Sequence, residues 1–208
     1  EPIGVVAAIS AFNHPFNLIV HQAIPAIATG CPVIVKPALT TPLSCIALVE
    51  LLREAGLDVP YCQAAILDNE GSEALAIDAR VDFFSFIGSS RIGWYLRSKL
   101  APGTRCALEH GGAAPVIVSE DVDIPSIVTP LAKGGFYHAG QVCVSTQILY
   151  AHDAIYEHVL RELTTRTEAL ITGDPTDANT DVGPLISTAD VDRIDSWVNE
   201  AKNQGAQV

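Results

Sequence analysis

The sequence is poor in positive charge. Lysine and arginine together number 12, against 24 aspartates and glutamates, so the formal net charge of the 208 residues is −12. Binding to nucleic acid or to an anionic membrane surface calls for clustered lysine and arginine. The composition therefore argues against both kinds of partner, and we expect neither.

Long hydrophobic runs and paired cysteine motifs are also missing. Every apolar run is much shorter than the ~20 residues of a membrane span, and no basic segment leads into a signal-type apolar core. The five cysteines are widely spaced, with no Cys-x-x-Cys pair. An odd number at such spacing argues against a disulfide framework or a zinc site, so we expect no metal and a reducing, cytoplasmic location.

What is present is an alternation of apolar strands and helices. Hydrophobic residues make up 49% of the chain, which allows a sizeable core. Continuous apolar runs typical of parallel strands lie at residues 3–10, 32–36, 61–67, 81–87, 115–119 and 145–151. Helical patterns lie at residues 17–29, 43–55, 71–79, 89–100, 123–138, 153–171 and 187–203. The alternation predicts a doubly wound, Rossmann-like α/β fold with a parallel sheet. The interruption of the periodicity by a Gly-Gly pair predicts a domain boundary at Glu109–Gly112.

One strand-to-helix junction has features of an anion-binding turn. In FSFIGSSRIG an apolar strand is followed by Gly88, Ser89 and a predicted helix that contains Gly93. The first turn of a helix presents free backbone N–H groups and the positive end of its dipole, and both favour a phosphate. The same residues also describe an ordinary helix capped by serine.

Three further polar residues follow predicted strands. Lys36 ends VIVK at the edge where open α/β sheets bind ligands, although a lysine that extends to solvent fits equally. Asn13 lies in a polar turn, where its amide is either an oxyanion donor or an ordinary turn residue. Glu109 ends an apolar run, and apolar surroundings would suit a general base. The alternatives are a surface carboxylate at that position, or His110 as the base.

Cys143 lies in FYHAGQVCVSTQ, between a helix-like run and a strand-like run. In a reducing compartment a cysteine is by default a small buried hydrophobe. The alternative is a thiol nucleophile, since an amide, a carboxylate, a lysine and a phosphate-type turn occur in the same α/β chain.

These features together resemble the aldehyde dehydrogenase superfamily of NAD(P)-dependent enzymes. The matching stretches are FNHPFNLIVHQAIPAIATGCPVIVKPA, FIGSSRIG, LEHGGAAP and GQVC, in the family's order, and GDPTDANTDVGPLIS is similar as well. The resemblance implies oxidation of an aldehyde to a carboxylic acid through a cysteine-bound thiohemiacetal and thioester. It also implies an NAD(P)-binding domain over residues 1–109, followed by an α/β catalytic domain over residues 110–208.

The resemblance also implies a role for each matching residue. Cys143 is the nucleophile, and its backbone N–H forms an oxyanion hole with the side-chain amide of Asn13. Glu109 is the general base that activates water. Lys36 belongs to this catalytic set and also binds the adenosine ribose. The other positions implied in cofactor binding are Ile9, Ser10, Phe12, Gly88, Ser89 and Gly93.

Several positions depart from the residues usual in this family. His110 replaces an aliphatic residue, Ala113 a lysine or asparagine, and Ser145 an alanine or glycine. Ile148 stands where an arginine is often found, so this position gives no support to an anionic substrate. Leu39 stands where NAD-preferring members often carry a glutamate that repels a 2′-phosphate. NAD is therefore the expected cofactor, and NADP is not excluded.

Members of this family are more than twice as long, so the resemblance implies that the chain is a central part of one, with both domains incomplete. It contains neither the later Glu-x-Phe-Gly-Pro segment nor the arm that pairs subunits, and the full-length form is expected to be a homodimer or homotetramer. The expected partner is a small-molecule aldehyde. The alternatives are acyl transfer to coenzyme A, a non-catalytic structural fragment, and a cysteine hydrolase that uses His110 or His138.

Overall fold

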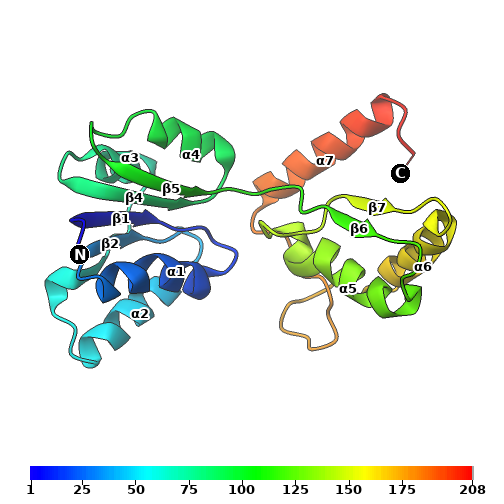
Figure 1. Ribbon diagram of the computed structural model, residues 1–208, viewed down its shortest axis with the longest axis horizontal. Coiled ribbons are helices and arrows are strands. Elements are labelled where there is room, and N and C mark those ends of the chain that lie inside the picture. The colour runs from blue at the N-terminus through cyan, green and yellow to red at the C-terminus, as the bar shows by residue number, and fades with distance from the viewer. Residues whose placement is uncertain (208) are drawn as a thin grey trace. The chain divides into compact units, whose positions relative to one another are not determined.

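The structure, a computed structural model, describes residues 1–207 and separates into two compact units (Figure 1). The first unit is Glu1–Gly111, and the second begins at Gly112. The change from one unit to the other therefore falls within the Gly-Gly pair that interrupts the periodicity of the sequence.

The first unit contains a five-stranded sheet in which all neighbouring strands are parallel, in the order β3-β2-β1-β4-β5. The strands are β1 (Val5–Ile9), β2 (Val33–Lys36), β3 (Cys62–Ala64), β4 (Val81–Ile87) and β5 (Arg105–Glu109). The helices are α1 (Pro15–Ala28), α2 (Leu43–Glu54), α3 (Asn69–Ile77), α4 (Ser90–Arg97) and the short 3₁₀ helix η1 (Val59–Tyr61). The predicted α/β fold with a parallel sheet is confirmed for this unit.

The two faces of this sheet each bury one set of strand side chains. Val6 and Ala8 of β1 belong to a core shared with α1 and α2, whereas Ala7 and Ile9 belong to a core shared with α3 and α4. Figure 1 shows the two helix pairs on opposite faces of the sheet. Burial of one aliphatic side chain contributes about 1.5–3 kcal/mol. A strand covered on both faces therefore reads as the continuous apolar run VVAAI.

The edge strand β3 is shorter than the run predicted over 61–67. Only three residues form β3, and Ala65 adds one more hydrogen bond, from its N–H to the carbonyl of Val35 at 2.9 Å. The chain then leaves the sheet to reach Asp68, whose carboxylate caps α3 by accepting a hydrogen bond from the N–H of Gly71 at 2.8 Å. The strand therefore ends before the apolar run does, and the chain turns toward the N-cap of α3.

The second unit is built around a parallel pair of strands, β6 (Val116–Val118) and β7 (Leu149–Ala151). Its helices are α5 (Ile124–Phe136), α6 (Tyr156–Glu168), α7 (Thr188–Asn203) and the short 3₁₀ helix η2 (Tyr137–Gly140). Ile124 and Val128 of α5 pack with Val159 of α6 in a small core. Val118 of β6 is buried, whereas Ile117 is 83% exposed, so one face of this strand pair is bare. The strand predicted over 145–151 is confined to its last three residues.

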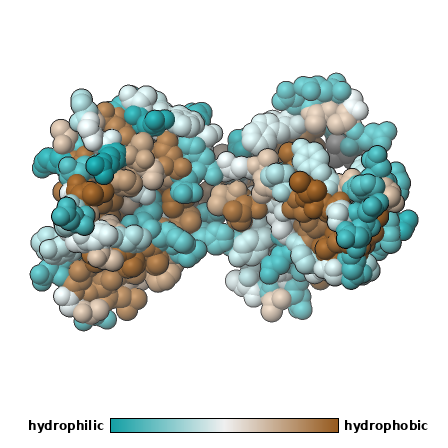
Figure 2. Space-filling model, in the orientation of Figure 1, coloured by the Kyte–Doolittle hydropathy of each residue, from teal (hydrophilic) through white to brown (hydrophobic). Residues whose placement is uncertain are grey.

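Figure 2 shows apolar patches among hydrophilic residues on the visible face of each unit. Among residues 1–207, no helix is both long enough and apolar enough to cross a membrane.

Candidate active site

The carboxyl ends of β1 and β4 lie side by side, at the point where the strand order reverses. The chain runs from β1 outward to β2 and β3, then returns to place β4 and β5 on the other side. Ile9 pairs with both Lys36 and Phe86, and Ile87 pairs with Glu109. Ligands of open α/β sheets bind at such a switch point. The structure therefore brings the strand-end residues predicted from the sequence to one edge of the sheet.

Ser10 and Lys36 form the part of this edge that follows β1 and β2. The N–H of Ser10 donates to the carbonyl of Lys36 at 3.0 Å. The side chain of Ser10 is only 4% exposed, and its buried Oγ has no hydrogen-bond partner within residues 1–207. Because a buried hydroxyl without a partner is costly, Ser10 marks a place for a polar ligand group.

The structure does not support the interpretation that Lys36 extends to solvent. Its side chain is 9% exposed. Burial lowers the pKa of its ammonium group, and the nearby carboxylate of Asp68 partly offsets this by favouring the charged form. A buried ammonium at a strand end is placed to meet a ligand rather than water.

The turn after β4 differs in one respect from the prediction of free N–H groups. The N–H of Gly88 already donates to the carbonyl of Glu109 at 3.0 Å, so it is not free for a phosphate. A Cβ on Gly88 would lie 2.7 Å from the ring of Phe86, so no larger residue fits without movement. Ser89 is the N-cap residue of α4, but its hydroxyl makes no capping bond. The hydroxyl and the first turn of α4 are therefore the groups that remain for an anion.

Glu109 is exposed, so of its two interpretations the structure fits a surface carboxylate rather than one in apolar surroundings. It ends β5, an edge strand of the sheet. His110 is half-buried rather than exposed. Its ring lies edge-on to Phe86, with ring centres 6.1 Å apart, and edge-on to Trp94, with centres 5.5 Å apart.

Gly93 owes its place in α4 to the ring of His110. A Cβ at Gly93 would collide with Nε2 of His110 and lie 3.0 Å from Cδ1 of Phe86. The sequence pattern predicted close packing at Gly93, but it did not identify the partner, because His110 follows β5, outside the helix that carries Gly93.

We expect Gly93→Ala to destabilise the full-length protein by about 1–2 kcal/mol. Because the added Cβ would overlap Nε2 of His110, the overpacking cost lies in the upper part of the usual range, at about 2–3 kcal/mol, and the better helix propensity of alanine returns about 1 kcal/mol. Urea denaturation followed by circular dichroism measures the change. Gly111→Ala is the control, because an added Cβ there meets nothing within 4 Å. A wild-type midpoint for Gly93→Ala, or no recovery when His110→Ala is added, would contradict this packing.

A buried glutamine that sequence reasoning missed ties the two central strands together. Nε2 of Gln22, on α1, donates to the carbonyl of Ile9 at 3.2 Å and to the carbonyl and Oγ of Ser85 at 3.2 and 2.9 Å. Its only sequence signal is a polar residue within an apolar helix.

The turn after β1 is held by a second contact, in which the hydroxyl of Thr41 donates to the carbonyl of Phe12 at 3.4 Å. Phe12 and the adjoining Asn13 are half-buried at this end of the sheet.

In the second unit, three consecutive left-handed residues lead to Cys143. The φ angle is 51° at His138, 55° at Ala139 and 74° at Gly140, so the helix predicted to reach residue 138 ends at Phe136. This conformation costs roughly 1–2 kcal/mol at each residue other than glycine. Such strain persists where neighbouring contacts enforce it, and it gathers at functional sites. We call residues 138–145 the nucleophile turn.

The side-chain amide of Gln141 enforces this conformation. Its Nε2 donates to the carbonyl of His138 at 2.9 Å and to that of Pro184 at 3.4 Å. Its Oε1 accepts a hydrogen bond from the N–H of Ile186 at 2.9 Å. Sequence reasoning gave Gln141 no role, because its partners at 184 and 186 lie more than forty residues further along the chain.

Cys143 is the second residue of a tight turn closed by a hydrogen bond of 3.1 Å from the N–H of Ser145 to the carbonyl of Val142. The N–H of Cys143 takes no part in that bond. The thiol is exposed, Cys106 is partly exposed, and the buried cysteines are Cys31, Cys45 and Cys62. Cys143 is therefore the thiol best placed to meet a substrate. Within residues 1–207, no three His, Cys, Asp or Glu side chains are grouped to hold a metal ion.

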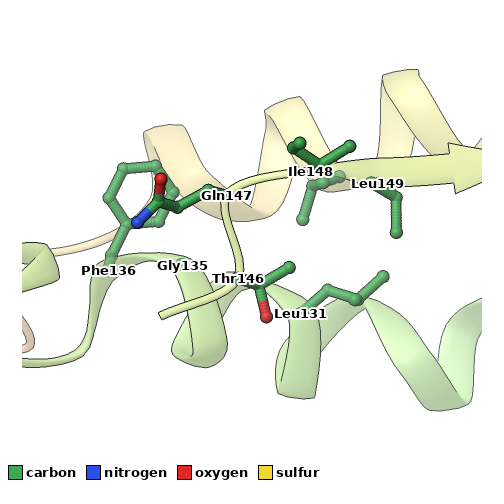
Figure 3. Close-up of a pocket in the computed structure, with 8 residues that line it drawn as sticks. Leu131, Gly135, Phe136, Thr146, Gln147, Ile148 and Leu149 are labelled. Atoms are coloured by element: carbon green, nitrogen blue, oxygen red, sulfur yellow. The ribbon is translucent and has the colours of Figure 1, made fainter. Parts of the chain in front are cut away.

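An apolar cavity of about 140 Å³ lies behind the nucleophile turn, between α5 and the start of β7. Figure 3 shows Ile148 and Leu149 across from Leu131 of α5, with Thr146 nearby. Ile148 therefore lies in an apolar wall. No charged residue lines this cavity among the described residues.

Comparison with known proteins gives a consistent result along the whole chain. A family model described as "Aldehyde dehydrogenase family" matches residues 1–208. The 3-sulfolactaldehyde dehydrogenase of Priestia aryabhattai is 40% identical over 210 residues, which cover all of this chain and 43% of that protein.

Two solved structures are similar over nearly the whole chain. The betaine aldehyde dehydrogenase of Staphylococcus aureus, in complex with NAD⁺, has a TM-score of 0.95 and 32% identity, over all of this chain and 42% of that one. The glyceraldehyde-3-phosphate dehydrogenase of Methanocaldococcus jannaschii, complexed with NADP, has a TM-score of 0.92 and 34% identity, over 99% of this chain and 46% of that one. The chain thus spans less than half the length of these proteins.

Proposed function

The chain belongs to the aldehyde dehydrogenase family, and from this premise we propose that the full-length protein oxidises an aldehyde to a carboxylic acid with NAD or NADP. In this proposal residues 1–109 bind the cofactor and residues 110–208 supply the nucleophile. The relatives are named for different aldehydes, among them 3-sulfolactaldehyde and betaine aldehyde. Family membership therefore leaves the substrate open.

The edge of the sheet at β1 and β4 fits a nicotinamide dinucleotide. Among residues 1–207, Ser10 carries a buried hydroxyl without a partner, Lys36 a buried ammonium group, and Ser89 a hydroxyl that makes no capping bond. Ribose hydroxyls and phosphate oxygens need such donors, and a switch point is where α/β folds offer them. Bound there, the nicotinamide supplies the hydride acceptor for the oxidation.

The chemistry of the remaining steps lies with the protein's own residues. The thiolate of Cys143 adds to the aldehyde carbon, which forms a C–S bond and leaves negative charge on the former carbonyl oxygen. The amide of Asn13 and the N–H of Cys143 donate to that oxygen, and loss of one such donor typically costs about 3 kcal/mol. Once the carbon has lost its hydride, Cys143 carries a thioester. Glu109 takes a proton from water, whose oxygen attacks the thioester and releases the acid and the thiolate.

One observation carries the proposal: the exposed thiol of Cys143 lies in a strained turn held by Gln141. The test is to incubate the purified full-length protein with NAD and a panel of aldehydes, measure NADH, and identify the product by mass spectrometry. Equal amounts of NADH and free acid are expected. Formation of NADH only with coenzyme A, giving a thioester product, would instead support the acylating alternative. Absence of NADH with every aldehyde and either cofactor would overturn the proposal.

We expect NADP to be accepted, with a preference for NAD below about a thousandfold in kcat/KM. The exposed side chain of Leu39, three residues after Lys36, offers no carboxylate to repel a 2′-phosphate. Leu39→Glu should raise the ratio of NAD to NADP efficiency by about tenfold, and the uncharged Leu39→Gln is the matched control. A preference above a thousandfold in the unaltered protein would mean that another group rejects the phosphate.

A further inference from the structure

A second cavity, of about 310 Å³, lies directly beside the nucleophile turn. The last turns of α5 supply Pro130 and Lys133 to its wall, and the nucleophile turn supplies Val142 and Val144. Cys143 lies between these two lining residues in the chain, although its own side chain is not part of the wall. The volume is at the lower end of the range for small-molecule sites, about 300–1,000 Å³, and suits a short substrate.

The two walls of this cavity are held together within the second unit. The N–H of Thr146 donates to the carbonyl of Gly134 at 3.0 Å, which bonds the end of α5 to the chain just after the nucleophile turn. A Cβ on Gly134 would lie 2.9 Å from Oγ1 of Thr146, so this close approach requires glycine. The backbone of Lys133, the neighbour of Gly134, therefore has a set position relative to the turn that carries Cys143, and its side chain is exposed.

Among the described residues that line the cavity, Lys133 carries a charge and the others are uncharged. The ion pairs recorded within residues 1–207 join other basic groups, such as Arg80, Lys99 and Arg193, to carboxylates, and none involves Lys133. Its ammonium group lies 6.0 Å from the ring centre of Tyr137, at the edge of cation–π range. A cation without a protein carboxylate remains available to a ligand anion.

We propose that this cavity takes a short aldehyde that carries a carboxylate or sulfonate, and that Lys133 contacts the anionic group while the carbonyl lies at Cys143. Pro130, Val142 and Val144 offer apolar contact to the methylene groups between the two ends. The net charge of −12 repels anions at long range, so recognition of such a substrate needs a local cation. The proposal rests on the proposed function and names the substrate class for the same nucleophile.

The test compares two aldehydes of equal chain length, succinic semialdehyde and butanal, on the full-length protein. We expect Lys133→Gln to lower kcat/KM for succinic semialdehyde by about 10- to 100-fold, since it removes one charge-assisted contact. The value for butanal should change less than about threefold, which also shows that the variant is folded. Lys133→Arg should keep most of the preference, and added salt should weaken only the reaction of the anionic aldehyde.

Lys202→Gln is the matched control, because Lys202 also lies in the last turn of a helix, α7. Lys202→Gln should change the rate with neither aldehyde. A general effect of removing a lysine from the end of a helix dipole would instead appear in both Lys133→Gln and Lys202→Gln. A sulfonated aldehyde of the same length distinguishes a sulfonate from a carboxylate preference. If butanal is oxidised and Lys133→Gln leaves the ratio of the two aldehydes unchanged, this inference is overturned while the proposed function stands. If no aldehyde is oxidised, both are overturned.

Discussion

Replacement of Cys143 by alanine is expected to lower aldehyde oxidation by the full-length protein by at least about 10⁴-fold. The thiolate forms the covalent bond to substrate, so its removal leaves no path to the thioester, and removal of a nucleophile in comparable enzymes costs on the order of 10⁴–10⁶. The measurement is the steady-state rate of NADH formation under saturating aldehyde and cofactor. Cys143→Ala should still fold, because the side chain is exposed and packs little.

Cys106→Ala is the control for this experiment, because Cys106 is the other thiol with some exposure. It should keep nearly full activity. Alkylation followed by mass spectrometry gives an independent readout near pH 8. Burial raises the pKa of Cys45 to about 11, and the neighbouring Cys62 thiol adds to this, so Cys45 should react far more slowly than Cys143. A Cys143→Ala protein with more than a few per cent of wild-type activity would remove Cys143 from the role of nucleophile.

The second large effect is expected for Glu109→Gln, which should lower steady-state turnover by about 10²- to 10⁴-fold without preventing the first turnover. A glutamine cannot take a proton from water, so the thioester on Cys143 should accumulate after one equivalent of NADH has formed. Rapid mixing should show a burst of NADH close to the enzyme concentration, followed by a slow phase. Intact-mass spectrometry should find the acylated protein.

Glu54→Gln is the control, because Glu54 is an exposed carboxylate at the end of α2, away from the sheet edge that carries Glu109. Its kinetics should match the wild type. Normal turnover in Glu109→Gln would transfer the role of base to His110 or to water alone. If coenzyme A restores turnover in that variant and yields an acyl-CoA, thiolysis rather than hydrolysis releases the product.

Several expectations remain predictions. Two of them concern the whole protein: a homodimeric or homotetrameric state and a cytoplasmic location. Two concern the reaction: the separate roles of residues 1–109 and 110–208, and the choice between hydrolysis and acyl transfer to coenzyme A. The same holds for the roles of Asn13, Lys36 and the cofactor-binding set, for which the structure supplies positions and chemical groups.

Most of the first unit could be predicted from the sequence, because its signals are local. Apolar runs buried on both faces mark β1, β2 and β4, and the ends of these runs locate Ser10, Lys36 and Gly88. The weaker predictions fell where a distant partner decided the outcome. The strand at 61–67 stopped early, before Asp68, which caps α3. Glu109 lies exposed at the end of β5, which is an edge strand.

By itself, the sequence determined the order of elements, the chemical groups at the strand ends and the family. These features depend on hydrophobic periodicity, glycine positions and short motifs, all of which involve residues close together in the chain. Only the tertiary structure decided how those groups are held. It placed the ring of His110 against Gly93, the amide of Gln141 on the backbone near Ile186, and Lys133 in the wall of a cavity beside the nucleophile turn. Each of these arrangements joins different elements of the fold, so its energy depends on packing that no local pattern encodes.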